Sequence, residues 1–148
     1  MKKIGFLLLS FGIIGLTNIS CKEKVAPVSE RIAKNWTASS VKEGTSVVYT
    51  KGGTSNVRPG YSSFSLNLAA APTASLREYD NNSFTGQYDV TDTKLTLKSL
   101  NPQPTGTGGT IEYTIVSLNN EGTELKLLRT TPSQKTGTNT NEYTLVSQ

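Results

Sequence analysis

The sequence predicts an all-β fold, an antiparallel up-and-down meander of eight or nine strands with a short N-terminal helix. After residue 35, apolar and polar residues alternate, and no apolar period of 3.6 residues lasts longer than two turns. Thr and Ser, which are weak helix formers, make up 37 of the 148 residues. The lack of crossover helices argues against a parallel sheet, which leaves a closed barrel or a two-sheet sandwich.

The chain divides into three segments. Residues 1–20 are expected to be a signal peptide, residues 21–28 a polar tether that contains Pro27, and residues 29–148 a single β-barrel domain. In that domain, residues 29–34 are expected to form one or two helical turns with Ser29 as the N-cap.

Strands are expected wherever the alternation holds between clusters of turn-forming residues. The turn formers are Glu43-Gly44, Asp80-Asn81-Asn82, Thr91-Asp92-Thr93, the Pro- and Gly-rich loop 101–109 and Asn119-Asn120-Glu121-Gly122. The strands between them fall at 36–41, 46–51, 64–68, 75–79, 84–90, 95–98, 111–115, 125–127 and 143–145.

The first 21 residues carry the clearest targeting signal. Lys2 and Lys3 precede an apolar run over residues 4–16, which is too short to span a membrane but suits a secretory signal. The only Cys of the chain, Cys21, follows the small residue Ser20. This stretch resembles a bacterial lipoprotein signal peptide, although Asn18 departs from its pattern. The resemblance implies that Cys21 is acylated, palmitate included, and that the protein is an outer-membrane lipoprotein of the cell envelope.

Composition excludes several classes of function. The chain has no His, so the commonest general base, the Ser-His and Cys-His nucleophile pairs and the usual zinc ligand are all missing. Removal of Lys2 and Lys3 leaves 13 basic residues against 11 acidic ones, so the net charge falls from +4 to +2. The basic residues are spread singly, which argues against nucleic-acid binding. No metal site and no cofactor are predicted.

The start and the hairpins of the domain resemble those of the small lipocalin-like lipoproteins of Gram-negative envelopes. The resemblance rests on the signal peptide, the short helix, Lys34-Asn35-Trp36-Thr37 at the first strand, the hairpin 84–97 and the late strand Glu142-Tyr143-Thr144-Leu145. It implies a lipocalin-like barrel whose base is closed by Trp36. Lys34 stands at the glycine position of the lipocalin G-x-W motif, so only Trp36 is carried over.

Two sets of residues imitate catalytic motifs. Ser39-x-x-Lys42, Ser65-x-Asn67 and Lys135-Thr136-Gly137 follow the order found in penicillin-binding enzymes. That chemistry needs the Ser and the Lys one helical turn apart, whereas positions i and i+3 of a strand point to opposite faces. The Gly-rich loop Pro104–Gly109 leads into a strand instead of a helix, so it is interpreted as a mobile hairpin loop rather than a phosphate site.

Glu78 and Asp80 are the remaining catalytic candidates. On one strand face their Cα atoms would lie roughly 6.5–7 Å apart, a spacing compatible with retaining glycoside hydrolysis. Asp80 is more simply explained as the start of the Asp-Asn-Asn turn, and nothing else in the sequence supports hydrolysis. The chain is therefore predicted not to be an enzyme.

The aromatic residues offer two interpretations. As pocket residues they would hold an apolar ligand, and the candidates are Tyr49, Phe64, Tyr88, Tyr113 and Tyr143. As packing residues they would fill a barrel that about eight strands can just close without a cavity, which is the interpretation we prefer for most of them. Trp36 is expected to be a packing anchor.

Two functional hypotheses follow. The first is a lipid-anchored, non-enzymatic envelope protein whose barrel binds a small hydrophobic ligand. The alternative is an accessory lipoprotein with a filled core that docks onto another envelope protein or a glycan. An apolar cavity of about 300 Å³ or more would favour the first, whereas a filled core with an exposed aromatic patch would favour the second.

Overall fold

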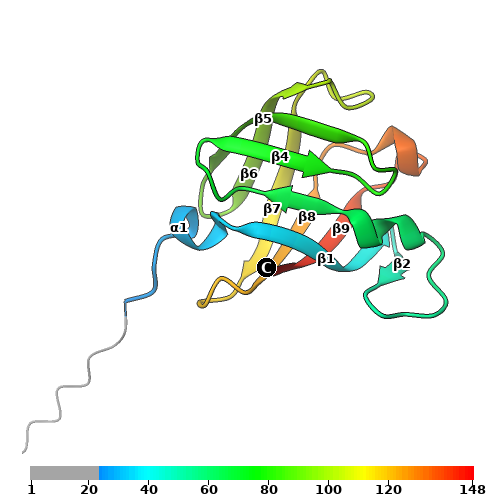
Figure 1. Cartoon of the computed structure of the whole chain (residues 1–148), viewed down its shortest axis with the longest axis horizontal. Helices are drawn as coiled ribbons and strands as arrows, with labels where there is room; N and C mark the ends of the chain where they lie inside the picture. The colour runs from blue at the N-terminus through cyan, green and yellow to red at the C-terminus, as the bar shows by residue number, and fades with distance from the viewer. Residues whose placement is uncertain (1–23) are drawn as a thin grey trace, which may run out of the picture.

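The computed structural model describes residues 24–148, and Cys21 and the predicted signal peptide lie outside the described residues. Figure 1 shows a strongly curved sheet with a short helix beside its N-terminal strand. The helical elements are α1 (Val28–Ile32), η1 (Pro59–Ser63) and η2 (Gln134–Thr136). The strands are β1 (Asn35–Glu43), β2 (Ser46–Thr50), β3 (Ser65–Asn67), β4 (Thr73–Arg77), β5 (Ser83–Val90), β6 (Lys94–Asn101), β7 (Ile111–Leu118), β8 (Glu124–Arg129) and β9 (Asn141–Ser147).

The sheet closes on itself through its first and last strands. From β3 to β9 each strand pairs antiparallel with the next, β9 pairs with β1, and β1 pairs with β3 through residues 35–37. These eight strands form a closed barrel, and β2 adds a ninth strand along the second half of β1. The predicted antiparallel meander is confirmed, and closure decides in favour of the barrel over the sandwich.

Strand β1 carries a bulge that changes which positions face inward. Trp36 and Ala38 are buried at even positions, whereas Val41 and Glu43 are buried at odd ones. The register with β9 shifts between Ala38 and Ser40, so one extra residue resets the alternation. The second half of β1 therefore directs Glu43 inward.

Helix α1 covers one end of the barrel. Ile32 and Trp36 are fully buried there, and the side chain of Arg31 donates hydrogen bonds to the carbonyl oxygens of Leu118 and Asn119 at 2.9 and 2.8 Å. The prediction of Ser29 as N-cap is wrong. The cap is Pro27, and the helix begins one residue before Ser29, so the Ser29 hydroxyl is already inside the first turn.

The free edge of β2 is covered by the loop that follows it. Asn56 accepts a hydrogen bond from the backbone N–H of Thr50 at 2.8 Å and donates one to its carbonyl oxygen at 3.0 Å. The N–H of Arg58 donates to the carbonyl oxygen of Val48. These bonds occupy backbone groups that an exposed strand edge would offer to another chain.

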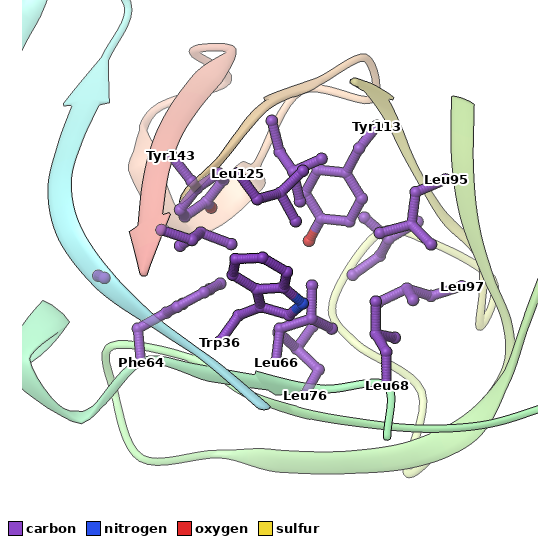
Figure 2. Packing of buried hydrophobic residues seen from close by; sticks show 14 of the residues in the cluster. Trp36, Phe64, Leu66, Leu68, Leu76, Leu95, Leu97, Tyr113, Leu125 and Tyr143 are labelled. Atoms are coloured by element: carbon purple, nitrogen blue, oxygen red, sulfur yellow. The ribbon is translucent and has the colours of Figure 1, made fainter. Parts of the chain in front are cut away.

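The interior is filled by side chains from every strand of the barrel. Figure 2 shows the indole of Trp36 in the middle of this cluster, with Phe64 and Tyr143 on one side and Leu95 and Leu97 on the other. Trp36, Leu95 and Leu97 have no exposed surface. Alternating inward residues of eight strands thus pack into a solid apolar core.

Candidate functional site: the polar end of the barrel

The buried polar residues among residues 24–148 all lie at the end of the barrel opposite α1, which we call the polar end. They are Glu43, Glu78, Arg129, Ser133, Thr136 and Asn141. Strand ends bring them together: Glu43 ends β1, Arg129 ends β8, Asn141 begins β9, and Glu78 directly follows β4. Buried polar groups are costly unless they are paired. The polar end therefore depends on hydrogen bonds and ion pairs, whereas the rest of the core is apolar.

One half of the polar end is a hydrogen-bonded chain centred on Tyr61 of η1. The Nε of Arg58 lies 2.7 Å from Glu43 Oε1, and the hydroxyl of Tyr61 donates to the same oxygen at 3.0 Å. Asn141 then donates to the hydroxyl groups of Tyr61 and Tyr143 at 3.4 and 3.2 Å. Burial raises the pKa of Tyr61 and of Tyr143, so both hydroxyls stay protonated at neutral pH.

The other half is an ion-pair cluster around Glu78. Lys135 Nζ lies 2.5 Å from Glu78 Oε2 and 2.8 Å from Asp80 Oδ2, while Arg129 Nη1 lies 3.5 Å from Glu78 Oε1. Burial alone would lower the pKa of Lys135, but its hydrogen bonds to Asp80 and Glu78 outweigh burial and raise it. Lys135 therefore holds residues 130–140, which we call the cover segment, against the turn after β4. The hydroxyl of Tyr79 adds a hydrogen bond to the Lys135 carbonyl oxygen at 3.0 Å.

A small cavity lies where the two halves meet. Its volume is about 10 Å³, and Tyr61, Phe64, Glu78, Tyr79, Arg129, Ser133, Asn141 and Tyr143 line it. That volume is close to the minimum that holds one water molecule. Arg129 is only 3% exposed, and its Nε has no hydrogen-bond partner among the described residues. Leaving a buried N–H of this kind unpaired costs about 1–3 kcal/mol, so an acceptor placed beside Arg129 Nε would stabilise this end of the barrel.

The structure places all the predicted pocket aromatics in the core. Phe64 and Tyr143 stack with ring centroids 4.9 Å apart, Tyr113 meets Tyr143 edge-on, and Tyr49 packs against Tyr61. Tyr88 stands apart from these pairs, and its hydroxyl donates to the carbonyl oxygen of Leu68. Of the five candidates, only Phe64 and Tyr143 border the cavity.

The residues of the imitated catalytic motifs have other partners. Lys42 forms an ion pair with Glu142, and Lys135 with Glu78 and Asp80, and no hydrogen bond within residues 24–148 joins either to Ser39. Loop 102–110 leads from β6 into β7 with no helix after it, as expected. Asp80 accepts hydrogen bonds from the backbone and the side chain of Asn82, which confirms its predicted role in the turn.

The placement of Glu78 and Asp80 on one strand face is wrong. Strand β4 ends at Arg77, because the N–H of Glu78 donates to the carbonyl oxygen of Asn82 and closes the turn. The two carboxylates nevertheless meet on the ammonium of Lys135. With a cation between them, neither is a free base for activating water.

Sequence reasoning missed Arg129, Ser133 and Asn141. Arg129 continues the inward series Leu125 and Leu127 of β8, and Asn141 precedes Tyr143 and Leu145 on the inward face of β9. The period of two therefore contained the signal for these two residues. Ser133 lies outside any strand, and no pattern in the sequence marks it.

No family model and no curated protein match the chain. Among solved structures, a lipocalin-like protein from Bacteroides uniformis is 14% identical over 80% of this chain and 99% of its own, with a TM-score of 0.48. An uncharacterized protein from Bacteroides eggerthii is 10% identical over 79% and 99%, also with a TM-score of 0.48. At this level neither likeness bears on function, and the strand pairing defines the fold. Within residues 24–148 there is no helix long and apolar enough to cross a membrane.

Proposed function

We propose that this chain is a non-enzymatic, lipid-anchored envelope protein whose barrel binds a small molecule at its polar end. The observation that carries the proposal is the clustering of the buried polar residues around a cavity bordered by Arg129, whose Nε has no partner in the part of the chain that the structure describes. Up-and-down barrels of eight strands commonly hold one small ligand at or inside the mouth. Here the mouth is the end that α1 does not cover.

Because the core is filled, we do not expect the ligand to be a large hydrophobic molecule held inside the barrel. A drug-sized ligand needs a pocket of roughly 300 Å³ or more, whereas the cavity at the polar end has about 10 Å³. A filled core is also what the accessory-protein alternative requires. However, the large hydrophobic residues exposed within residues 24–148 are four valines, so the aromatic docking patch expected for that alternative is not among them.

The lipid anchor is the second part of the proposal. Cys21 is the only Cys of the chain and follows an apolar run preceded by Lys2 and Lys3. One acyl chain gives marginal membrane binding, whereas two or more anchor a protein stably. Helix α1 begins at Val28, seven residues after Cys21, and residues 24–27 form no helix or strand. An anchor at Cys21 would therefore hold the α1 end near the membrane and leave the polar end pointing away.

Native mass spectrometry of the full chain released from bacterial membranes tests the binding function. We expect a ligand mass that disappears on denaturation. Ser133→Leu, which places a larger side chain at the cavity wall, should abolish that mass, whereas Val116→Leu on the exposed outer face should retain it. An empty protein in every preparation would contradict ligand binding.

Membrane fractionation with labelled palmitate tests the anchor. Wild-type protein should incorporate the label and sediment with membranes, and Cys21→Ala should do neither. Lys22→Ala keeps the acylated residue and serves as the control that retains the label. Membrane association that persists in Cys21→Ala would overturn the lipoprotein assignment.

A further inference from the structure

One buried hydrogen-bond donor at the polar end has no acceptor within residues 24–148. This donor is Arg129 Nε–H, whose side chain is almost completely buried. The hydroxyl of Tyr143 accepts a hydrogen bond from Asn141 and also interacts with the side chain of Arg129. Because a hydroxyl that accepts a hydrogen bond can still donate its own proton, Tyr143 and Arg129 Nε can both donate to one acceptor in this cavity.

The charges at the polar end are already balanced. Arg58 is paired with Glu43, Arg129 faces Glu78, and Lys135 lies between Glu78 and Asp80. Three cations therefore face three carboxylates. An additional anion would bring an uncompensated charge next to buried Glu78, which is strongly unfavourable in a site of this kind. The electrostatics select against an anion and in favour of a neutral acceptor.

The walls of the cavity are largely aromatic. Phe64 and Tyr143 stack on each other with centroids 4.9 Å apart, and Tyr61 and Tyr79 contribute two further rings with centroids 5.0 Å apart. Aromatic faces of this kind pack well against a planar conjugated group. A planar group with a strong acceptor and no charge is an amide or a related carbonyl compound.

We propose that the polar end binds the carbonyl oxygen of a small neutral amide, which accepts hydrogen bonds from Arg129 Nε and the hydroxyl of Tyr143. This inference rests on the proposed ligand-binding function and specifies the chemical class of the ligand. Burial raises the pKa of Tyr143, so its hydroxyl keeps its proton over the working range of pH.

The cavity must widen for an amide to enter. About 10 Å³ accommodates roughly one water molecule, which is less than an acetamide molecule needs. The cover segment supplies Ser133 to the cavity wall and is tied down through Lys135, whose side chain is 18% exposed. Entry of an amide therefore requires the cover segment to move, and this segment lies outside the residues that pair β8 with β9.

A comparison of acetamide with acetate tests the ligand class, because the two molecules have nearly the same shape and differ in charge. The readout is the Arg129 Nε–H resonance of the ¹⁵N-labelled full chain, with ionic strength matched by sodium chloride. We expect a saturable shift with acetamide and at least a tenfold weaker response to acetate. A response to acetate equal to or stronger than that to acetamide would overturn the neutral-ligand inference while leaving ligand binding at the polar end intact.

Tyr143→Phe tests the second donor. It removes one hydroxyl from the cavity wall and should weaken acetamide binding about tenfold, the equivalent of one lost hydrogen bond. Tyr88→Phe is the matched control, because its hydroxyl bonds to Leu68 and does not line the cavity. Unchanged affinity in a folded Tyr143→Phe protein would contradict the role of Tyr143. If neither acetamide nor acetate shifts the Arg129 Nε–H resonance in the wild-type protein, the cavity holds water only and the amide inference is wrong. Native mass spectrometry tests ligand binding independently of this result.

Discussion

The indole N–H of Trp36 donates a hydrogen bond of 2.8 Å to the carbonyl oxygen of Ile32, the last residue of α1. This bond joins the helix to the second residue of β1 inside the core. Ile32 and Trp36 are both fully buried, so the helix is anchored by packing as well as by the hydrogen bond. The end of the barrel next to α1 is therefore closed in part by two residues only four positions apart in the sequence.

Trp36→Phe should destabilise the barrel by about 2–4 kcal/mol, because it removes this hydrogen bond and leaves a cavity in the middle of the core. Urea unfolding measures the change in the free energy of unfolding. Val116→Ala, at a half-exposed position of β7, is the control and should change stability by less than about 0.5 kcal/mol. Equal effects of the two substitutions would show that Trp36 does not anchor the core.

The strands could be predicted from the sequence because each of them alternates and each is followed by residues that favour turns. Alternation does not specify where a strand stops. Strand β4 ends at Arg77, before the predicted residue 79, because the carbonyl oxygen of Asn82 captures the N–H of Glu78. The bulge near Ser39 could not be predicted from the sequence either, because it depends on the register between β1 and β9.

The polar end was harder to predict because its interactions join residues that are far apart in sequence. Lys135 and Glu78 are 57 residues apart, and nothing in either neighbourhood identifies the other as a partner. Arg129 continues an inward apolar series, but its charge suggests a solvent-exposed position. Pattern reasoning assigns charged residues to the surface by default, so a buried functional charge is the kind of residue it misses.

Asn56→Ala should expose the edge of β2. The substitution removes both side-chain hydrogen bonds to the backbone of Thr50 and leaves an N–H and a carbonyl group that another chain can pair with. We expect concentration-dependent self-association, visible by analytical ultracentrifugation, while the native fold is kept. Asn120→Ala, in the turn between β7 and β8, is the control and should stay monomeric. A strictly monomeric Asn56→Ala protein would mean that other features protect this edge.

Glu78→Leu should destabilise the protein by about 3–5 kcal/mol, because it leaves the buried guanidinium of Arg129 without its carboxylate. Adding Arg129→Met removes that uncompensated charge, so the double variant should be more stable than Glu78→Leu alone. Chemical denaturation of the two variants measures the difference. A double variant less stable than the single one would show that Arg129 is held by groups other than Glu78.

Acid should loosen the cover segment through Asp80. Burial tends to raise the pKa of Asp80, but hydrogen bonds from Lys135 and Asn82 outweigh it and hold the pKa below the ordinary value of 3.8. A carboxyl group with a lowered folded-state pKa stabilises the native state above pH 3.8 and loses that contribution as the pH falls through the folded pKa. Lys135 has a raised pKa, so its contribution is complete below pH 10.5 and is lost only in strong alkali.

Hydrogen exchange of the amides of Ser133, Thr136 and Thr138, corrected for intrinsic rates, measures this effect, because their bonds lie within the cover segment. Protection should be constant near neutral pH and should fall below pH 3.8 in the wild-type protein. Asp80→Asn should lower protection already at neutral pH and flatten the fall in acid, because the charged partner of Lys135 is gone. Asp89→Asn breaks the exposed pair with Lys98 and should leave the wild-type profile unchanged. An acid profile that is identical in Asp80→Asn and the wild type would assign the loosening to a group other than Asp80.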